Sequence, residues 1–482
     1  MRVRALSTFL LVLPTLVLAA ETPQSTIPIT TSSAEARELY LQARDLNERL
    51  KGTEANKVFA KAVEKDPQFA MAWLQLAFTS GTAKELQNGL NKAVALADKV
   101  SEGERLFILS TKAANDSKPA EQRRMLDELV RKFPNDPRVH LQLGNVLFAQ
   151  QDYDGAIREL SRSAELDPKF SQPYNQLGYA YRFKGNNAEA EKAFVKYAEL
   201  IPDDPNPHDS YAELLMRLGR FDESITRYRK ALSIDPHFLS AYIGIANDQI
   251  FLGKGDEARK TLTEMQSKAR TDGERRLALF WTSQTYAHEG RWAEAIKSLE
   301  DEKKIADSAG DIVSASQDIN FIGNLLLGAG KPAEAAARFE ESVKMLGKAQ
   351  VSDDIKEAGR RAHLFDMGRV ALRKGDLADA REYSAKYTAA VAARKVPFEV
   401  RQAHELAGML AVQAKDWDTA LKELPQASQQ NPRVLYFTGL AWQGKGDPTK
   451  ATQAFKATVD FNQLSGVLPF VRADARRQLA RS

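Results

Sequence analysis

The stretch AELDPKFSQPYNQLGYAYRFKG, residues Ala164–Gly185, decides the fold because helix-breaking residues interrupt an otherwise helical pattern. A proline inside a helix costs about 3 kcal/mol and a glycine about 1 kcal/mol relative to alanine. We expect Pro168 to end one helix and Pro173 to lie in the first turn of the next, where the missing N–H costs little. Gly178 is expected where two helices touch, and Gly185 in the turn between them. The stretch therefore predicts a joint between helical hairpins.

The prolines of such joints recur at a fixed interval. Pro134, Pro168, Pro202 and Pro236 follow one another at intervals of 34 residues, the spacing of tetratricopeptide repeats. When each proline is numbered position 32, small residues occupy positions 8 and 20 and a large residue occupies position 24. These are Gly144, Gly178, Ala212 and Ala246 at position 8, Ala156, Ala190, Ser224 and Ala258 at position 20, and Leu160, Phe194, Tyr228 and Leu262 at position 24. By these residues the chain resembles the tetratricopeptide repeat (TPR) family.

The resemblance implies an all-α fold, a right-handed α-solenoid of about twelve helix-turn-helix hairpins. Such an array can grow beyond the size of a single core because each hairpin packs only on its neighbours. We expect a signal peptide at 1–20, a flexible leader at 21–35, repeats of 34 residues at 36–270, repeats of 40–45 residues at 271–465, and a polar-faced capping helix at 466–482. In the longer repeats the second helix of each hairpin is expected to lengthen. The seam near 267–276 is the expected boundary between the two styles.

The first residues have the layout of an export signal. Arg2 and Arg4 precede an apolar run from Ala5 to Ala20, which is short for a membrane span and ends in small residues. No cysteine follows the run, so we do not expect a lipoprotein. The sequence thus predicts a periplasmic or secreted protein with no integral membrane span after cleavage. An uncleaved anchor is the alternative.

Composition and motifs argue against several functions. The chain has 482 residues, a net charge of +4, six histidines and no cysteine, so no general case exists for nucleic-acid binding or for a cysteine metal site. The sequence contains no Walker loop, G-x-S-x-G or H-E-x-x-H motif. Repeats leave little room for a catalytic domain. We therefore expect no enzyme activity, no cofactor and no metal, and we expect the histidines to serve packing.

The TPR resemblance implies that proteins or peptides bind along the concave face, which first helices line at positions 2, 5, 9 and 12. Asparagines beside apolar and aromatic residues suit a peptide backbone. The expected peptide-binding residues are Leu141, Asn145, Phe148, Asn175, Tyr179, Arg182, Asp209, Glu213, Met216, Ile243, Asn247 and Ile250. A carboxylate clamp of the kind found in chaperone-binding TPRs is not expected, because Leu141 and Gln176 do not match its pattern.

Three functions stay open at this point. The first is a non-enzymatic interaction scaffold of the bacterial cell envelope. The second is a periplasmic chaperone or polysaccharide-export accessory that binds export clients or glycan. The third, an enzyme with an unrecognised site, would need a deep pocket at the seam with converging titratable groups. The segment 102–146 also resembles TPR arrays of bacterial signalling proteins, which suggests a bacterial origin. The basic tail, Arg472, Arg476, Arg477 and Arg481, could make weak contact with an envelope surface, although a solvated cap is the simpler expectation.

Overall fold

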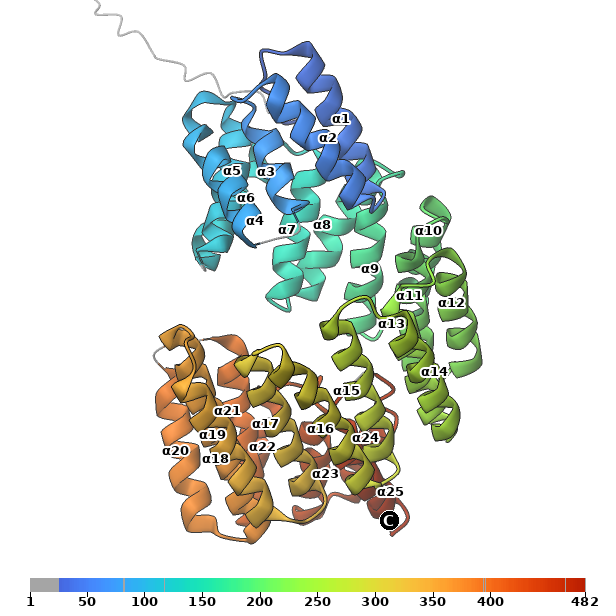
Figure 1. The fold of residues 1–482 in the computed structure, drawn as a ribbon, viewed down its shortest axis with the longest axis vertical. Coiled ribbons are helices and arrows are strands. Elements are labelled where there is room, and N and C mark those ends of the chain that lie inside the picture. Colours follow the sequence, from blue (N-terminus) through green and yellow to red (C-terminus); the bar gives the residue numbers. More distant parts are fainter. Residues whose placement is uncertain are drawn as a thin grey trace, which may run out of the picture. The chain divides into compact units, whose positions relative to one another are not determined.

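A computed structural model describes residues 26–80, 83–116, 118–392, 394, 396–463 and 465–481. In this part of the chain every regular element is helical, with 25 α-helices and three short 3-10 helices (Figure 1). The expected signal peptide at 1–20 lies outside the described residues. The chain forms two compact units, one up to Leu200 and one from Ile201, which are described separately below. The change of repeat length expected near residue 270 therefore falls inside the second unit.

The first unit is built from ten α-helices and one 3-10 helix. They are α1 (Ala34–Glu48), α2 (Gly52–Lys65), α3 (Ala70–Phe78), α4 (Ala83–Ala95), η1 (Ala97–Lys99), α5 (Glu102–Asn115), α6 (Pro119–Lys132), α7 (Pro137–Ala149), α8 (Tyr153–Leu166), α9 (Ser171–Phe183) and α10 (Asn187–Leu200).

The second unit contains the remaining helices. They are α11 (Pro205–Arg217), α12 (Phe221–Ile234), α13 (Leu239–Phe251), α14 (Gly255–Lys268), α15 (Asp272–His288), α16 (Trp292–Ser308), α17 (Ile312–Gly328), α18 (Pro332–Lys348), α19 (Asp353–Lys374), α20 (Leu377–Ala392), α21 (Pro397–Gln413), α22 (Trp417–Glu423), η2 (Leu424–Gln426), α23 (Pro432–Gly444), α24 (Pro448–Val459), η3 (Leu468–Phe470) and α25 (Arg472–Leu479).

Consecutive helices pair as hairpins, from α1 with α2 to α23 with α24, and each hairpin packs on the next within its unit (Figure 1). The expected solenoid of about twelve hairpins is confirmed. The small and large positions meet as predicted, since a Cβ atom on Gly178 would lie only 2.5 Å from Cε1 of Phe194. Pro168 follows the end of α8, Pro173 lies in the first turn of α9, and Gly185 has φ of +77°. The joint that the sequence predicted is therefore present.

The longer repeats differ from the expectation in one respect. Both helices of a hairpin lengthen, not only the second: α15, α16, α17 and α18 have 17 residues each. In the regular repeat, α11 has 13 residues and α12 has 14. A matched increase is the physical requirement, because an unpaired extra turn of one helix would leave its apolar stripe exposed.

Local sequence sets the helix boundaries. Asp136 caps α7 by accepting a hydrogen bond from the backbone N–H of Arg138 at 3.0 Å, and Pro137 follows at the first helical position. The hairpin turns require a left-handed residue, which is glycine at most sites. Gln151 and Lys415 fill that place with φ of +65° and +58°.

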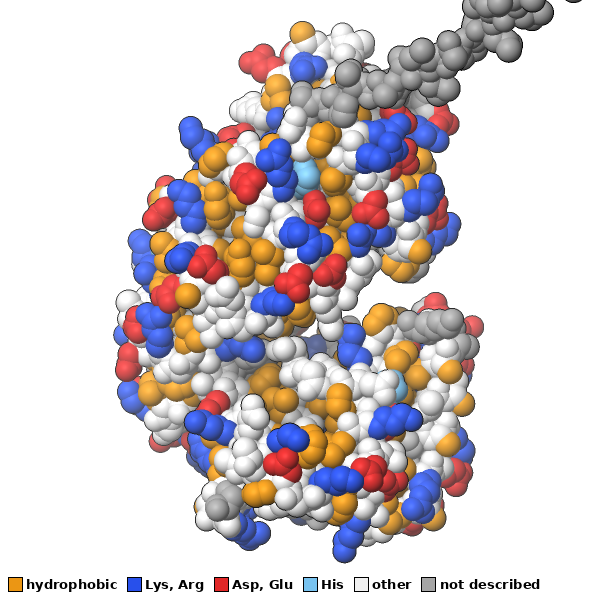
Figure 2. Space-filling view, turned by 180° about the vertical axis from the view of Figure 1, so that it is seen from behind, with side chains coloured by type: hydrophobic (Ala, Val, Ile, Leu, Met, Phe, Trp, Pro, Cys, Tyr) orange, Lys and Arg blue, Asp and Glu red, His pale blue; other side chains and the backbone are white. Residues whose placement is uncertain are grey.

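Lysine and arginine side chains alternate with acidic side chains over the face seen in Figure 2. This mixing agrees with the small net charge of +4. None of the helices in the described ranges combines the length and the apolar character that a membrane crossing needs.

Candidate binding faces

The first helices α7 and α9 carry the six predicted binding residues of the first unit. Leu141 is buried with 4% of its surface exposed and Arg182 with 8%, whereas Asn145, Phe148, Asn175 and Tyr179 are half-buried. The guanidinium of Arg182 lies over the ring of Tyr179, 4.8 Å from its centroid. The part of this row that is open to a ligand therefore consists of two asparagines and two aromatic side chains.

The side-chain carbonyl oxygens of both asparagines lack the hydrogen-bond partner that a buried acceptor normally has. The Oδ1 atoms of Asn145 and Asn175 are buried, and neither accepts a hydrogen bond from any described residue. A buried acceptor without a partner costs about 1–3 kcal/mol. Turning either amide outwards would break no hydrogen bond of its oxygen. The two side chains can therefore reorient at low cost towards the N–H groups of a peptide.

The N-terminal segment 26–33 packs on the first unit. The backbone N–H of Ile27 donates to Asp136 Oδ2 at 3.1 Å, and that of Thr30 donates to Glu104 Oε1 at 2.9 Å. The backbone N–H of Ser32 donates to Asp66 Oδ2 at 3.2 Å. The prediction of a flexible leader is therefore wrong for this segment, because three carboxylates bind its backbone.

This segment and the first helices enclose a cavity of about 360 Å³. Ile27, Tyr40, Phe107 and Leu141 form part of its apolar wall. Leu141, one of the predicted binding residues, thus faces a space that the chain's own N-terminal segment already borders.

In the second unit half of the six predicted binding residues are buried. Met216, Ile243 and Asn247 have 1%, 7% and 2% of their surface exposed. Asn247 donates its amide to the carbonyl oxygen of Ile243 in its own helix at 2.8 Å. These three side chains are packing residues in this structure, which corrects the expectation that they face a ligand.

The other three predicted residues of this unit are half-buried. They are Asp209, Glu213 and Ile250. Burial, together with the nearby carboxylate of Glu213, raises the pKa of Asp209 to about 7. Asp209 therefore changes charge near neutral pH and is not a fixed anion.

The C-terminal segment after α24 returns to the earlier helices of the second unit (Figure 1). Phe470 stacks on Trp292 with ring centroids 5.9 Å apart, and it touches the position of Gly328, where a Cβ atom would lie 2.5 Å from Cδ1 of Phe470. The guanidinium of Arg472 lies 4.7 Å from the ring centroid of Phe251. Ala475 of α25 packs with α24, but Arg472 is turned inwards and does not belong to a solvated polar face as expected.

A second cavity, of about 520 Å³, lies between this segment and the first helices α17, α19, α21 and α23. Its charged lining consists of Arg369, Arg373, Arg433, Arg477 and Asp474. Its apolar lining includes Trp292, Leu372, Met409, Phe437 and Phe470. None of the cationic residues was among the predicted peptide-binding residues, although Arg477 belongs to the basic tail that was considered for contact with an envelope surface.

Two arginines of the cavity lining, the buried Arg369 and the half-buried Arg433, donate hydrogen bonds to polar side chains outside that lining. Arg369 Nη1 donates to Asn324 Oδ1 at 2.6 Å and to Asp366 Oδ1 at 3.1 Å. Arg433 Nε donates to Glu405 Oε1 at 2.7 Å. Burial, together with the nearby charge of Arg433, lowers the pKa of Arg369 to about 10. Arg369 therefore remains charged at neutral pH.

The sequence contained a signal for this cavity. When the repeat numbering is extended so that Ala380 and Ala451 take position 20, Arg369 falls on position 9 and Arg433 on position 2. Position 9 is the place that Asn145 has in its own repeat, and position 2 belongs to the same first-helix row. The prediction missed Arg369 because it applied the rule only to the regular repeats, and it missed Arg433 because it named no residue at position 2.

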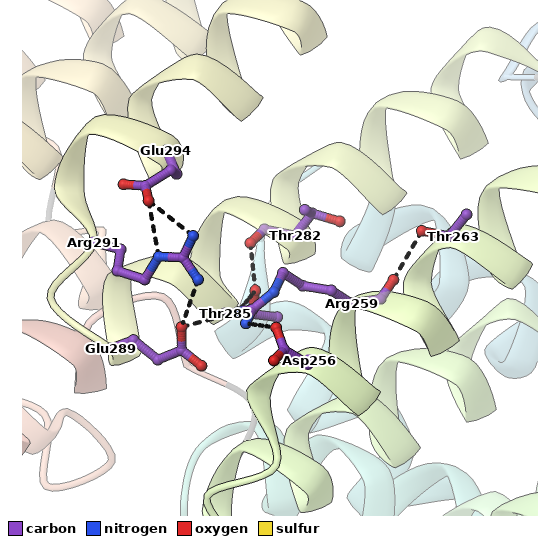
Figure 3. Close-up of polar contacts among 8 residues, drawn as sticks. All are labelled: Asp256, Arg259, Thr263, Thr282, Thr285, Glu289, Arg291 and Glu294. Atoms are coloured by element: carbon purple, nitrogen blue, oxygen red, sulfur yellow. Dashed lines mark hydrogen bonds and ion pairs between the residues drawn. The ribbon is translucent and has the colours of Figure 1, made fainter.

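The seam between the two repeat styles is crossed by a polar network (Figure 3). Arg259 of α14 donates from Nη1 to Glu289 at 3.1 Å and to Thr285 at 3.3 Å, and Arg291 donates to Glu289 at 3.4 Å. The ring of Tyr286 has both guanidinium groups at 4.6 Å from its centroid. The network ties α14 to α15 and α16.

A small cavity of about 200 Å³ adjoins this seam. Its titratable lining is His288, Glu289, Arg472 and Arg476. Burial, aided by the two arginines, lowers the pKa of His288 to about 3, so its ring is neutral at physiological pH. Glu289 is engaged by Arg259 and Arg291.

Two histidines at position 4 of their repeats make equivalent contacts. Nδ1 of His140 lies 2.7 Å from Glu159, and Nδ1 of His404 lies 2.7 Å from Glu423. Both contacts join the two helices of one hairpin. Within the described ranges, no group of three histidine or acidic residues has the arrangement of a metal site.

Paired helices at a repeating interval place the chain in the α-solenoid class of repeat proteins. Comparison with family profiles matches a TPR repeat at residues 144–185 and Tetratricopeptide repeats at 171–204, 215–280 and 322–395. The chain is a TPR repeat protein.

Similar proteins cover the chain only in part. Superkiller complex protein 3 of Mus musculus is 30% identical over 20% of this chain and 6% of its own length. The anaphase-promoting complex subunit CDC16 of Saccharomyces cerevisiae is 28% identical over 39% of this chain and 24% of its own length. The chain therefore spans less than a quarter of these relatives. A solved tetratricopeptide repeat protein from Parabacteroides merdae is 14% identical, covering 54% of this chain and 98% of that one, with a TM-score of 0.40.

Proposed function

We propose that this protein is a non-enzymatic scaffold that binds an extended peptide segment of a partner protein on the first-helix row of α7 and α9. The observation that carries this proposal is the pair of amides at Asn145 and Asn175, whose oxygens are buried without a partner. A peptide N–H can supply the missing hydrogen bond to either oxygen. Phe148 and Tyr179 lie in the same row and offer apolar surface to the side chains of the peptide.

The N-terminal segment supports the peptide chemistry. Its backbone N–H groups are bound by side-chain oxygens of Asp66, Glu104 and Asp136 in the first unit. The array thus already holds one stretch of chain by its N–H groups. A partner peptide would be held by the same kind of contact on the row of α7 and α9.

The cavity at the seam supports the proposal that the protein is not an enzyme. Its histidine is neutral and its carboxylate is engaged by two guanidinium groups. A pKa of about 3 makes the His288 ring a weak base, and the carboxylate of Glu289 is occupied by Arg259 and Arg291. The two side chains therefore do not form an acid–base pair.

We also propose that the protein is exported to the periplasm or secreted, as part of the bacterial cell envelope. The support is the sequence of residues 1–20, with Arg2 and Arg4 before an apolar run. Fractionation of expressing cells, followed by N-terminal sequencing, tests export. A cleaved chain in the periplasm or medium is expected, and an intact chain in the cytosol would contradict the proposal.

Cross-linking in cells followed by mass spectrometry tests the scaffold. Wild-type protein is expected to give a defined partner, and Asn175→Ala with Tyr179→Ala is expected to lose it. Lys192→Ala, on the exposed face of α10, is the matched control and should retain the partner. A partner that survives the double substitution would contradict the assignment of the row, and recovery of glycan in place of protein would favour an export accessory.

A further inference from the structure

The cavity of about 520 Å³ in the second unit has a lining that no repeat-packing requirement explains. Interiors between packed hairpins are filled by apolar side chains. Here four arginines and a single aspartate meet beside aromatic and aliphatic residues. We propose that this cavity binds an acidic segment of a partner protein, in which a carboxylate is flanked by an apolar side chain.

The first argument for an acidic ligand is the positive charge of the cavity lining. Asp366 pairs with Arg369 and Glu405 pairs with Arg433, and neither carboxylate lines the cavity. The cavity therefore presents the guanidinium groups of Arg369 and Arg433, and its one acidic residue, Asp474, is already paired with Arg477. A ligand that enters this space must bring negative charge to avoid leaving the cations desolvated.

The second argument is that some guanidinium nitrogens of Arg369 and Arg433 donate no hydrogen bond to the described residues. The hydrogen bonds of Arg369 to described residues use only Nη1, and those of Arg433 use only Nε. The remaining guanidinium nitrogens can donate to a carboxylate in the forked geometry that arginine favours. Asn324, Asp366 and Glu405 fix the two guanidinium groups in advance, so little side-chain entropy would be lost on binding.

Size and polarity select the class of ligand. A volume of about 520 Å³ lies within the usual range of about 300–1,000 Å³ for ligand pockets. It accommodates a few side chains and not a folded domain. Leu372, Met409 and Phe437 supply the apolar wall for the residue beside the carboxylate. An acidic peptide with alternating apolar residues satisfies both parts of the lining.

This inference rests on the proposed function and names a partner chemistry for a second site. The probe is a short fluorescein-labelled peptide in which glutamate alternates with leucine, with an otherwise identical glutamine peptide as its control. Fluorescence anisotropy with the full chain measures both affinities. We expect the glutamine peptide to bind about tenfold more weakly, a difference of about 1.4 kcal/mol. Equal affinities would overturn the proposal.

Substitutions locate the site. Arg373→Gln with Arg477→Gln removes the two cations that are exposed and leaves Arg369 and Arg433 unchanged. We expect this double variant to bind the glutamate peptide about tenfold more weakly. Arg381→Gln, an exposed arginine of α20 that does not line the cavity, is the matched control and should bind as the wild type does. Unchanged binding by the double variant would overturn the proposal, provided that circular dichroism shows the same helix content.

The two proposals fail in different ways. If the glutamate peptide does not bind but the Asn175- and Tyr179-dependent partner is still cross-linked in cells, the acidic-peptide site is wrong and the scaffold stands. If the peptide binds in the Arg373- and Arg477-dependent manner but no partner depends on the α7 and α9 row, the row is wrong and the cavity stands.

Discussion

Phe470 stacks on Trp292 with the two ring planes only 6° apart, although Phe470 follows the last hairpin and Trp292 begins α16. The contact joins the end of the repeat array to its middle within the second unit. It lines the cavity that we assign to an acidic peptide. The C-terminal segment is thus a structural part of the proposed site, and not only a cap.

Phe470→Ala should weaken the second unit. The substitution removes the stack on Trp292 and the contact at Gly328, and truncating a partly buried phenylalanine should cost about 2–3 kcal/mol. Hydrogen exchange should show faster local opening of α16 and of the C-terminal segment. Phe398→Ala, whose ring is 61% exposed, should leave exchange nearly unchanged. Equal effects of the two substitutions would contradict the packing described here.

Gly178→Ala should destabilise the first unit by about 1–3 kcal/mol, because the added methyl group overlaps the buried ring of Phe194. Gly347→Ala is the matched substitution within a helix, since a Cβ atom there meets nothing within 4 Å. It should be neutral or stabilise by up to about 1 kcal/mol through helix propensity. Thermal unfolding of both variants measures the difference, and the same sign for both would refute the role of position 8.

Lys415→Gly should stabilise the turn before α22. Lys415 has φ of +58°, a conformation that strains side chains but not glycine. We expect a gain of about 0.5–1 kcal/mol in urea unfolding. Gly185→Ala, at the equivalent turn with φ of +77°, should lose a similar amount. A loss of stability in Lys415→Gly would contradict this prediction, because it would mean that the contacts of the lysine side chain stabilise the turn by more than the backbone strain costs.

Asp248→Asn should change how stability depends on pH. Burial, together with the nearby carboxylate of Asp222, raises the pKa of Asp248 from 3.8 to about 8. The folded chain therefore binds a proton that the unfolded chain releases between these values. The stability that the protonated carboxyl group contributes to the folded chain is fully present below pH 3.8 and is lost as the pH rises through about 8.

The asparagine variant carries no such proton. Its stability relative to the wild type should increase from pH 5 to pH 8, by about 1.4 kcal/mol for each pH unit at most. Urea unfolding at several pH values tests this. A difference that stays constant with pH would mean that Asp248 is not buried as described.

The sequence predicted the contacts that the repeat pattern itself determines. Gly178 and Phe194 are 16 positions apart in one hairpin, so their contact follows from the repeat alone. The contacts of Phe470 with Trp292 and of Ile27 with Asp136 join non-repeating ends to distant hairpins, and periodicity carries no information on such pairs. Burial of Met216 and Asn247 was missed for the related reason that position in a repeat does not reveal what packs over it.

The central claim is that the row of α7 and α9 binds a partner, and site-specific photo-cross-linking tests it most directly. A photoreactive amino acid is placed at position 175 on α9 in one strain and at position 192 on α10 in another. The account predicts a partner adduct from position 175 and none from position 192. Adducts of equal yield from both positions, or from position 192 alone, would contradict it.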